Sequence, residues 1–237
     1  MPLWVTFVLI VRDLKPHTGE NVSIQIQVVE SQRFSQNSYV LWRESSPEAF
    51  VIDPGFDPDL ILQLLRKHNL TLTAIVLTHG HIDHIAGNAA MKAAFPNAPI
   101  IIGVNDAEML TDPMLNLSGA YGIPVVSPAA DRLVVEGDQL TVAGIELDVF
   151  DIPGHSPGHV VYLIRETTPM MVLGGDVLFQ GSVGRTDFPG GSFDQLATGI
   201  RTKLWPLPEA TKVFPGHGPM TMIGIERATN PFVGGAG

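Results

Sequence analysis

The chain has 237 residues, of which 45% are hydrophobic and 16% charged, so it is long enough to bury a substantial core. Its 24 acidic and 14 basic residues give a formal net charge of −10, which argues against nonspecific binding to nucleic acid or to an anionic membrane and favours a small-molecule partner. The absence of cysteine excludes disulfides, cysteine nucleophiles and thiolate metal ligands.

Residues 1–21 form an N-terminal extension whose role the sequence leaves unclear. The segment Met1 to Val11 is largely apolar, but it is too short to span a bilayer and lacks the basic start and cleavage site of a secretory signal. We expect an extra strand or a loosely packed extension here, with a membrane-associating start as the less favoured alternative. A cytoplasmic location follows as the expectation.

The first half of the remaining chain alternates between strand and helix patterns. Asp57 can cap a helix whose first turn contains Pro58, and a Pro- and Gly-rich stretch over 111–128 predicts a loop that could border a site. Short apolar or alternating runs predict strands at 23–28, 39–42, 49–52, 74–78 and 100–102, and periodic apolar positions predict helices from 58 to about 68 and at 87–95.

The second half repeats this plan. Ser192 and Gln195 form a capping-box pattern before a helix that runs to about Trp205. Strands are predicted at 140–142, 145–150, 160–164, 170–173 and 211–214. Helices and strands in both halves predict a layered α/β fold, with residues 22–237 as a single domain.

The segment 78–84, with the sequence THGHIDH, is the most informative part of the chain. It places three histidines and an aspartate, His79, His81, Asp83 and His84, directly after a predicted buried strand. Three further Gly-flanked candidates, His155, Asp176 and His217, also follow predicted strands. Side chains at strand ends converge in α/β proteins, and imidazole with carboxylate suits zinc and similar divalent ions. We therefore expect a site for two divalent ions, with zinc preferred and iron or manganese as alternatives.

Several residues near this motif have two interpretations. Asp176 is either a ligand or a turn-capping carboxylate, and Asp53 is either a turn residue or the hydrogen-bond partner of a ligand. His159 is expected to support a ligand rather than to bind metal. Arg185 is the one candidate for substrate binding, with a local ion pair to Asp187 as the alternative.

The THGHIDH segment, together with PGH at 153–155, GGD at 174–176 and PGHG at 215–218, resembles the metallo-β-lactamase superfamily from about residue 22 onward. The resemblance implies a four-layer αβ/βα sandwich with the site at one edge of two central sheets. It also implies that one ion is held by His79, His81 and His155 and the other by Asp83, His84 and His217. Asp176 is implied to bridge the two ions.

Within the superfamily, the run 184–191 (GRTDFPGG) and the C-terminal segments 224–227 and 230–232 resemble short bacterial glyoxalase II enzymes. This implies a thioesterase acting on S-lactoylglutathione or a similar hydroxyacyl thioester, in which Asp83 assists attack by a metal-bridged hydroxide. The missing cysteine argues against β-lactamases with a cysteine ligand, and the bridging Asp176 argues against those with a histidine-only pattern, so antibiotic hydrolysis is not expected. The short C-terminus argues against the added domain of nucleases. The alternative is a persulfide dioxygenase with one iron on His79, His155 and Asp176.

Overall fold

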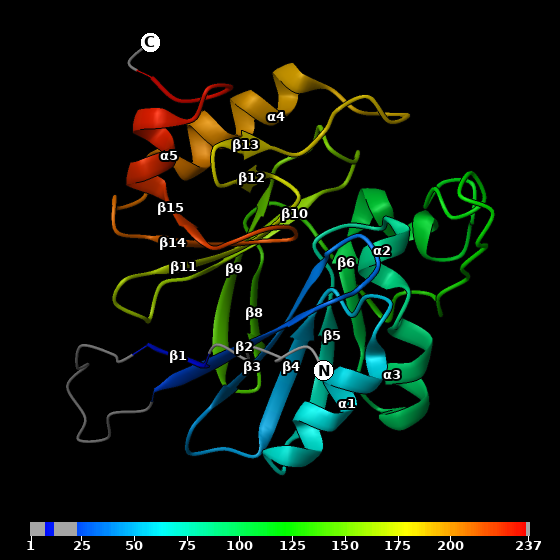
Figure 1. The fold of residues 1–237 in the computed structure, drawn as a ribbon. Coiled ribbons are helices and arrows are strands. Elements are labelled where there is room, and N and C mark those ends of the chain that lie inside the picture. Colours follow the sequence, from blue (N-terminus) through cyan, green and yellow to red (C-terminus); the bar gives the residue numbers. More distant parts are fainter. Residues whose placement is uncertain (1–7, 12–22, 236–237) are drawn as a thin grey trace.

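The computed structural model describes residues 8–11 and 23–235, which form two β-sheets packed face to face with helices on both outer faces (Figure 1). The first sheet and its helices come from the N-terminal half of the chain, and the second sheet with its helices comes from the C-terminal half. The layers therefore follow the order αβ/βα, as the sequence predicts.

The first sheet has seven strands in sequence order. The pairs from β1 to β4 are antiparallel and those from β4 to β7 are parallel. Its strands are β1 (Val8–Val11), β2 (Ile24–Glu30), β3 (Asn37–Arg43), β4 (Glu48–Ile52), β5 (Thr71–Val76), β6 (Ile100–Gly103) and β7 (Arg132–Val134). Its helices are α1 (Pro58–Lys67), the short α2 (Ile82–Ile85) and α3 (Asn88–Ala94), with a 3-10 turn at Val104–Leu110.

The second sheet has the order β15-β14-β11-β10-β9-β8, and only the β11–β14 pair is parallel. Its strands are β8 (Gln139–Val142), β9 (Ile145–Asp151), β10 (Val160–Ile164), β11 (Met171–Gly175), β14 (Lys212–Pro215) and β15 (Thr221–Met222). A separate hairpin consists of β12 (Leu178–Phe179) and β13 (Ser182–Val183). The outer layer contains α4 (Phe193–Gly199), a π-helical turn (Ile200–Leu204) and α5 (Ile223–Thr229).

Strand β10 shows why the chain forms four layers. Its alternate residues Tyr162 and Ile164 join the core between the two sheets, whereas Val161 and Leu163 join the core under α4 and α5. A third core fills the space between the first sheet and helices α1 and α3. Because successive side chains of a strand point to opposite faces, a strand that is apolar throughout must be covered on both sides.

The N-terminal segment β1 pairs antiparallel with β2 and so extends the first sheet at its edge. It lies within the extension predicted for residues 1–21; the other residues of that range lie outside the described part of the chain. Within the described residues, no helix is long and apolar enough to cross a membrane.

Three local predictions were wrong in detail. The Asp57 side chain does not cap α1, because its Oδ2 accepts hydrogen bonds from Ser31 Oγ (2.7 Å) and Gln32 N (2.8 Å). Strand β5 ends at Val76 rather than at Thr78, because the Thr78 amide donates a hydrogen bond to Asp53 Oδ1 instead of to a neighbouring strand. The helix after Ser192 is capped as predicted, but it becomes π-helical from Ile200. The strands β7, β12, β13 and β15 and the helices α2 and α5 were not predicted.

Candidate metal centre

The histidines and aspartates singled out from the sequence meet at one edge of the sandwich. His79 and His81 follow β5, His155 follows β9, Asp176 follows β11 and His217 follows β14. The helix α2, which starts directly after His81, carries Asp83 and His84 into the same space. Strand ends from both sheets therefore converge on one point, and loop residues supply the polar groups.

Three groups of three residues have the spacing needed to hold an ion, and two of them share no residue. Each offers ligand atoms that lie within 4.8 Å of one another. The first group contains His79, His81 and His155, and the second contains Asp83, His84 and His217. In the first group His81 Nδ1 and His155 Nε2 approach to 2.9 Å, and in the second His217 Nε2 lies 3.2 Å from Asp83 Oδ2.

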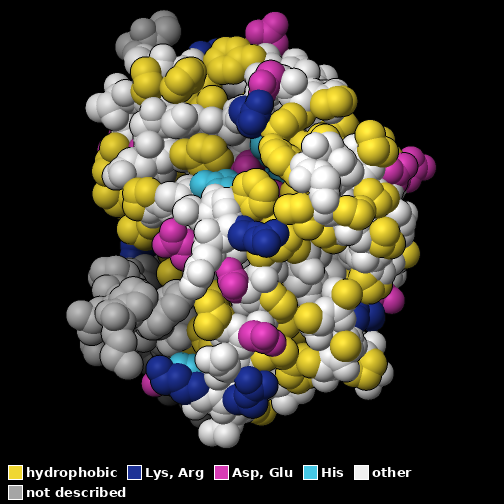
Figure 2. Space-filling view, turned by 45° about the vertical axis from the view of Figure 1, so that its right-hand side comes forward, with side chains coloured by type: hydrophobic (Ala, Val, Ile, Leu, Met, Phe, Trp, Pro, Cys, Tyr) yellow, Lys and Arg dark blue, Asp and Glu magenta, His cyan; other side chains and the backbone are white. Residues whose placement is uncertain are grey.

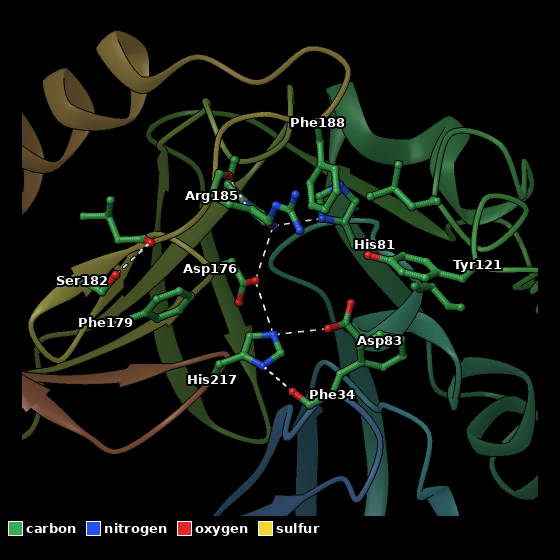
Figure 3. A pocket seen from close by; sticks show the side chains of 14 residues that line it. Phe34, His81, Asp83, Tyr121, Asp176, Phe179, Ser182, Arg185, Phe188 and His217 are labelled. Atoms are coloured by element: carbon green, nitrogen blue, oxygen red, sulfur yellow. Dashed lines mark hydrogen bonds and ion pairs between the residues drawn. The ribbon is translucent and has the colours of Figure 1, made fainter. Parts of the chain in front are cut away.

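Asp176 lies between the two groups and contacts both (Figure 3). Its Oδ2 is 3.4 Å from His155 Nε2 of the first group and 3.4 Å from His217 Nε2 of the second. Its Oδ1 is 3.5 Å from His84 Nε2. A carboxylate in this position can share its oxygens between two cations.

The donor atoms fit a divalent ion. His79 Nε2, His84 Nε2 and Asp176 Oδ1 are buried and have no hydrogen-bond partner among the residues that the structure describes. A buried polar atom without a partner costs roughly 1–3 kcal/mol, and a metal ion removes that cost. The set contains only imidazole and carboxylate, which suits zinc and iron alike.

Hydrogen bonds to the protein fix which ring nitrogen faces the site. His155 Nδ1 donates to the carbonyl of Arg185 (2.8 Å), and His217 Nδ1 donates to the carbonyl of Phe34 (3.0 Å). His84 Nδ1 donates to Asp53 Oδ2 (2.9 Å). With a proton held on Nδ1, each ring turns its Nε2 toward the cluster, and metal ligation requires this nitrogen to be unprotonated.

Asp53 is placed to orient ligands. It is buried, and its oxygens accept hydrogen bonds from the Thr78 amide (2.8 Å), the Thr78 hydroxyl (2.7 Å) and His84. Because the Thr78 hydroxyl donates its proton to Asp53, its oxygen accepts from His79 Nδ1 at 3.1 Å. Asp53 also lies near enough to His79 and His84 to form a third possible ligand group, but its bonds to Thr78 and His84 favour the orienting role.

His159 is buried beside the cluster and contacts Asp176 and His79. The His159 Nε2 accepts a hydrogen bond from the backbone amide of Asp176 at 2.9 Å. The His159 ring stacks on His79 with 4.8 Å between ring centroids. These contacts place it as a support for Asp176 and His79.

Burial and charge set the protonation states of the cluster. Burial lowers the pKa of His81 to about 3 and that of His79 well below its ordinary value. Burial also opposes charge on His84, but the carboxylates of Asp176, Asp83 and Asp53 outweigh it and raise the pKa of His84 to about 9. Carboxylates that favour a proton on His84 also favour a divalent cation at the same atom.

The cluster opens into a pocket with an apolar rim (Figures 2 and 3). Leu117 and Tyr121 of the predicted loop line it, as does Arg185. The Arg185 guanidinium binds Asp187 through two hydrogen bonds of 2.7 and 2.6 Å. Arg185 therefore makes the ion pair that was its alternative interpretation while still lining the pocket.

Asp106 is a buried residue of the site that the sequence analysis missed. Its Oδ2 accepts hydrogen bonds from the Gly80 amide (3.1 Å) and the Ser156 hydroxyl (2.6 Å), and its Oδ1 accepts from the Gly158 amide (2.6 Å). It thus connects the loop of His79 and His81 with the loop of His155. It lies three residues after β6, and this strand-end position, shared with the other site residues, was the available signal.

We expect Asp106→Asn to weaken metal binding by about 10- to 100-fold. One carboxylate oxygen becomes an amide donor and faces a backbone N–H or a hydroxyl that needs an acceptor. Zinc titration with a competing chelator measures the effect. The matched control is Asp131→Asn, since Asp131 is exposed and bonds to the opposite end of β6 through the Ile100 amide. Equal zinc affinity in the two variants would contradict the role of Asp106.

A four-layer sandwich with two His/Asp groups at one edge defines a metal-dependent hydrolase. The chain belongs to the metallo-β-lactamase superfamily, which it matches over residues 32–217. This confirms the family and the fold that the sequence motifs predict.

Among curated relatives, the chain is 34% identical over 213 residues to hydroxyacylglutathione hydrolase GloC of Haemophilus influenzae, covering 89% of this chain and 98% of the relative. It is 39% identical over 200 residues to the probable metallo-hydrolase YqgX of Bacillus subtilis, covering 84% and 92% of the two chains. Both matches extend over nearly the whole length of the relatives.

Three solved structures have the same fold. The BLEG-1 B3 metallo-β-lactamase has a TM-score of 0.84 at 39% identity and covers 89% of this chain and 100% of its own. TTHA1623 in a di-iron-bound form has a TM-score of 0.76 at 35% identity, with coverages of 86% and 98%. ETHE1 from Myxococcus xanthus has a TM-score of 0.73 at 28% identity, with coverages of 88% and 84%.

Proposed function

We propose that the protein hydrolyses hydroxyacyl thioesters of the S-lactoylglutathione type with two divalent ions. The observation that carries this proposal is the position of Asp176 between two complete groups of three ligands. The name of the Haemophilus influenzae relative, a hydroxyacylglutathione hydrolase, supports the substrate class. The partner of the protein is thus a small-molecule thioester.

The ligand assignment follows the two groups. His79 Nε2, His81 Nδ1 and His155 Nε2 would hold one ion, and Asp83, His84 Nε2 and His217 Nε2 would hold the other, with Asp176 shared between them. The di-iron-bound form of a 35% identical protein supports occupancy by two ions. Zinc remains our preferred metal, with iron and manganese as the alternatives, because the donor set accepts all three.

Bound divalent ions supply hydroxide at neutral pH and polarise the thioester carbonyl. Asp83 is the residue placed to handle the proton of the attacking water. Its Oδ2 lies beside His217, and its other oxygen makes no hydrogen bond within the described residues and faces the pocket. The thiol that leaves has an ordinary pKa of about 8.5, so its thiolate departs without a strong general acid.

The second candidate function is persulfide oxidation by a single iron on His79, His155 and Asp176. The likeness to ETHE1 from Myxococcus xanthus favours it, and His155 and Asp176 do lie 3.4 Å apart. In this alternative Asp83, His84 and His217 hold no ion. We favour hydrolysis because the run 189–191 and the C-terminal segments resemble short glyoxalase II enzymes, and because the curated hydroxyacylglutathione hydrolase is 34% identical whereas ETHE1 is 28% identical.

The deciding experiment uses the protein loaded separately with zinc and with iron. Hydrolysis of S-lactoylglutathione, oxygen uptake with glutathione persulfide and cleavage of a chromogenic cephalosporin are measured side by side, the last because one 39% identical neighbour is a B3 metallo-β-lactamase. Thioester turnover that is abolished in Asp83→Asn supports the proposal. Oxygen uptake with iron that survives in Asp83→Asn supports the dioxygenase, and rapid cephalosporin cleavage without thioester turnover would contradict both.

Helix α5 holds one wall of the pocket in place. Buried Glu226 accepts hydrogen bonds through Oε2 from the Gly181 amide (2.9 Å) in the β12–β13 turn and from Asn230 (2.8 Å). Asn230 also donates to the carbonyl of Ser182 at 3.0 Å. The hairpin fixed in this way contributes Phe179, Ser182 and Val183 to the pocket lining.

We expect Glu226→Gln to raise the KM for S-lactoylglutathione about 3- to 10-fold, with metal content unchanged and kcat within about twofold. The amide removes the charged acceptor of the Gly181 N–H and lets the hairpin shift. Steady-state kinetics measure KM and kcat separately. The control is Glu209→Gln, which releases the Arg227 side chain of the same helix but touches no hairpin residue. An unchanged KM, or loss of metal, would show that Glu226 does not act by holding the β12–β13 hairpin.

A further inference from the structure

The pocket above the cluster is walled by four aromatic side chains from four separate segments. Phe34 comes from the β2–β3 turn, Tyr121 from the loop over 111–128, Phe179 from β12 and Phe188 from the segment after β13. They surround the cluster in Figure 3. Phe188 packs edge-on against His81 (5.3 Å between ring centroids) and Phe179 against His217 (6.1 Å). A molecule whose reacting atom reaches the cluster must pass these rings.

Phe34 is held at the rim in a strained conformation. Its φ of 63° lies in the left-handed region, which bulky side chains rarely adopt. The strain is maintained because its carbonyl accepts the proton of His217 Nδ1 and its ring contacts Tyr121 edge-on (5.6 Å) and stacks on Phe56 (5.7 Å). Strain of this kind concentrates at functional sites, and here it fixes an aromatic surface beside the cluster.

Apart from the ions that the cluster would hold, the pocket has almost no free arginine or lysine charge to offer a substrate. Among the fourteen lining residues, all within the described part of the chain, Arg185 is the only arginine or lysine. Its guanidinium already binds both oxygens of Asp187 and lies 4.1 Å above the ring centroid of Phe188. A substrate carboxylate would therefore have to displace Asp187 to use this charge.

We propose that the thiol half of the substrate is uncharged and apolar, with an aromatic ring as the best fit. This inference rests on the proposed thioester hydrolysis and specifies which thioester the site prefers. Glutathione carries carboxylates and an ammonium group away from its reacting sulfur, and its carboxylates would lose water on entry without gaining a free arginine or lysine of the lining as counter-charge. An apolar thiol half instead exchanges water for contact with the four rings.

The test compares two lactoyl thioesters whose thiols have similar acidity, S-lactoylglutathione and the lactoyl thioester of benzyl mercaptan. We expect kcat/KM to be about tenfold or more higher for the benzyl compound. Tyr121→Ala should reduce this preference, whereas Phe193→Ala should leave it unchanged, because Phe193 is exposed on α4 and outside the pocket. Equal or faster hydrolysis of S-lactoylglutathione would overturn the inference while leaving the proposed function intact.

Asp187→Asn provides the converse test, because it frees the charge of Arg185. We expect kcat/KM for S-lactoylglutathione to rise about 3- to 10-fold relative to that for the benzyl thioester. Calorimetric binding of the matching thioethers, S-methylglutathione and benzyl methyl sulfide, gives a readout that needs no hydrolysis. Tighter binding of the glutathione thioether by the unmodified chain would contradict the inference, and hydrolysis of neither thioester by the metal-loaded protein would overturn the proposed function itself.

Discussion

Asp176→Ala is expected to lower the metal content from two ions per chain to one or none and to reduce kcat/KM for thioester hydrolysis about 1000-fold or more, equivalent to roughly 4 kcal/mol of transition-state stabilisation. The carboxylate contacts His155 of the first ligand group and His84 and His217 of the second. Its loss removes the carboxylate that lies between the two ligand groups and contacts both.

Metal content by mass spectrometry and thioester kinetics on the same sample check this prediction. The control is Asp194→Ala, an exposed aspartate of α4 with no contact to the cluster. Retention of both ions in Asp176→Ala would show that Asp176 does not bridge them. The close packing around Asp176 supports its fixed position, since a Cβ at Gly216 would lie 2.2 Å from Asp176 Oδ1.

Asp53→Asn is expected to weaken binding of the second ion about 10- to 100-fold and to destabilise the fold by roughly 1–3 kcal/mol. The amide keeps the shape of the carboxylate and tolerates the φ of 49° at this position. It replaces Oδ2, however, with a donor that faces the Nδ1–H of His84. His84 must then move its proton to Nε2, the atom that points into the cluster.

Zinc titration measures the metal affinity, and thermal unfolding measures the stability of the fold. The chemical shifts of the His84 ring nitrogens report which of them carries the proton. The metal affinity should fall while the fold is retained, because the core on both sides of β4 is untouched. Binding of two ions with unaltered affinity would contradict the orienting role of Asp53.

The chain's local patterns predict the fold and the gathering of the candidate ligands well, and the reason is physical. Apolar runs such as β10 must be covered on both faces, so a layered α/β fold follows from strands and helices in both halves, and the family resemblance implies its four layers. Candidate ligands such as His79 and Asp176 lie directly after strands, and strand ends converge.

Asp53 and His159 were predicted as supporting residues, but Asp106 and Glu226 were not, because their partners are distant in sequence. Asp106 meets Ser156 and Gly158 across the two halves of the chain, and Glu226 meets Gly181 45 residues away. The hairpin of β12 and β13 has two-residue strands, too short for a periodic pattern. Arg185 had two interpretations in the sequence, and only the folded structure shows that it forms the ion pair with Asp187 while lining the pocket.

The most direct measurement is anomalous X-ray scattering from crystals of the protein purified without added metal, combined with metal content in solution. We predict two ions per chain, one within reach of His79, His81 and His155 and the other within reach of Asp83, His84 and His217, with Asp176 between them. A single iron on His79, His155 and Asp176, with the second ligand group free of metal, would contradict the two-ion hydrolase.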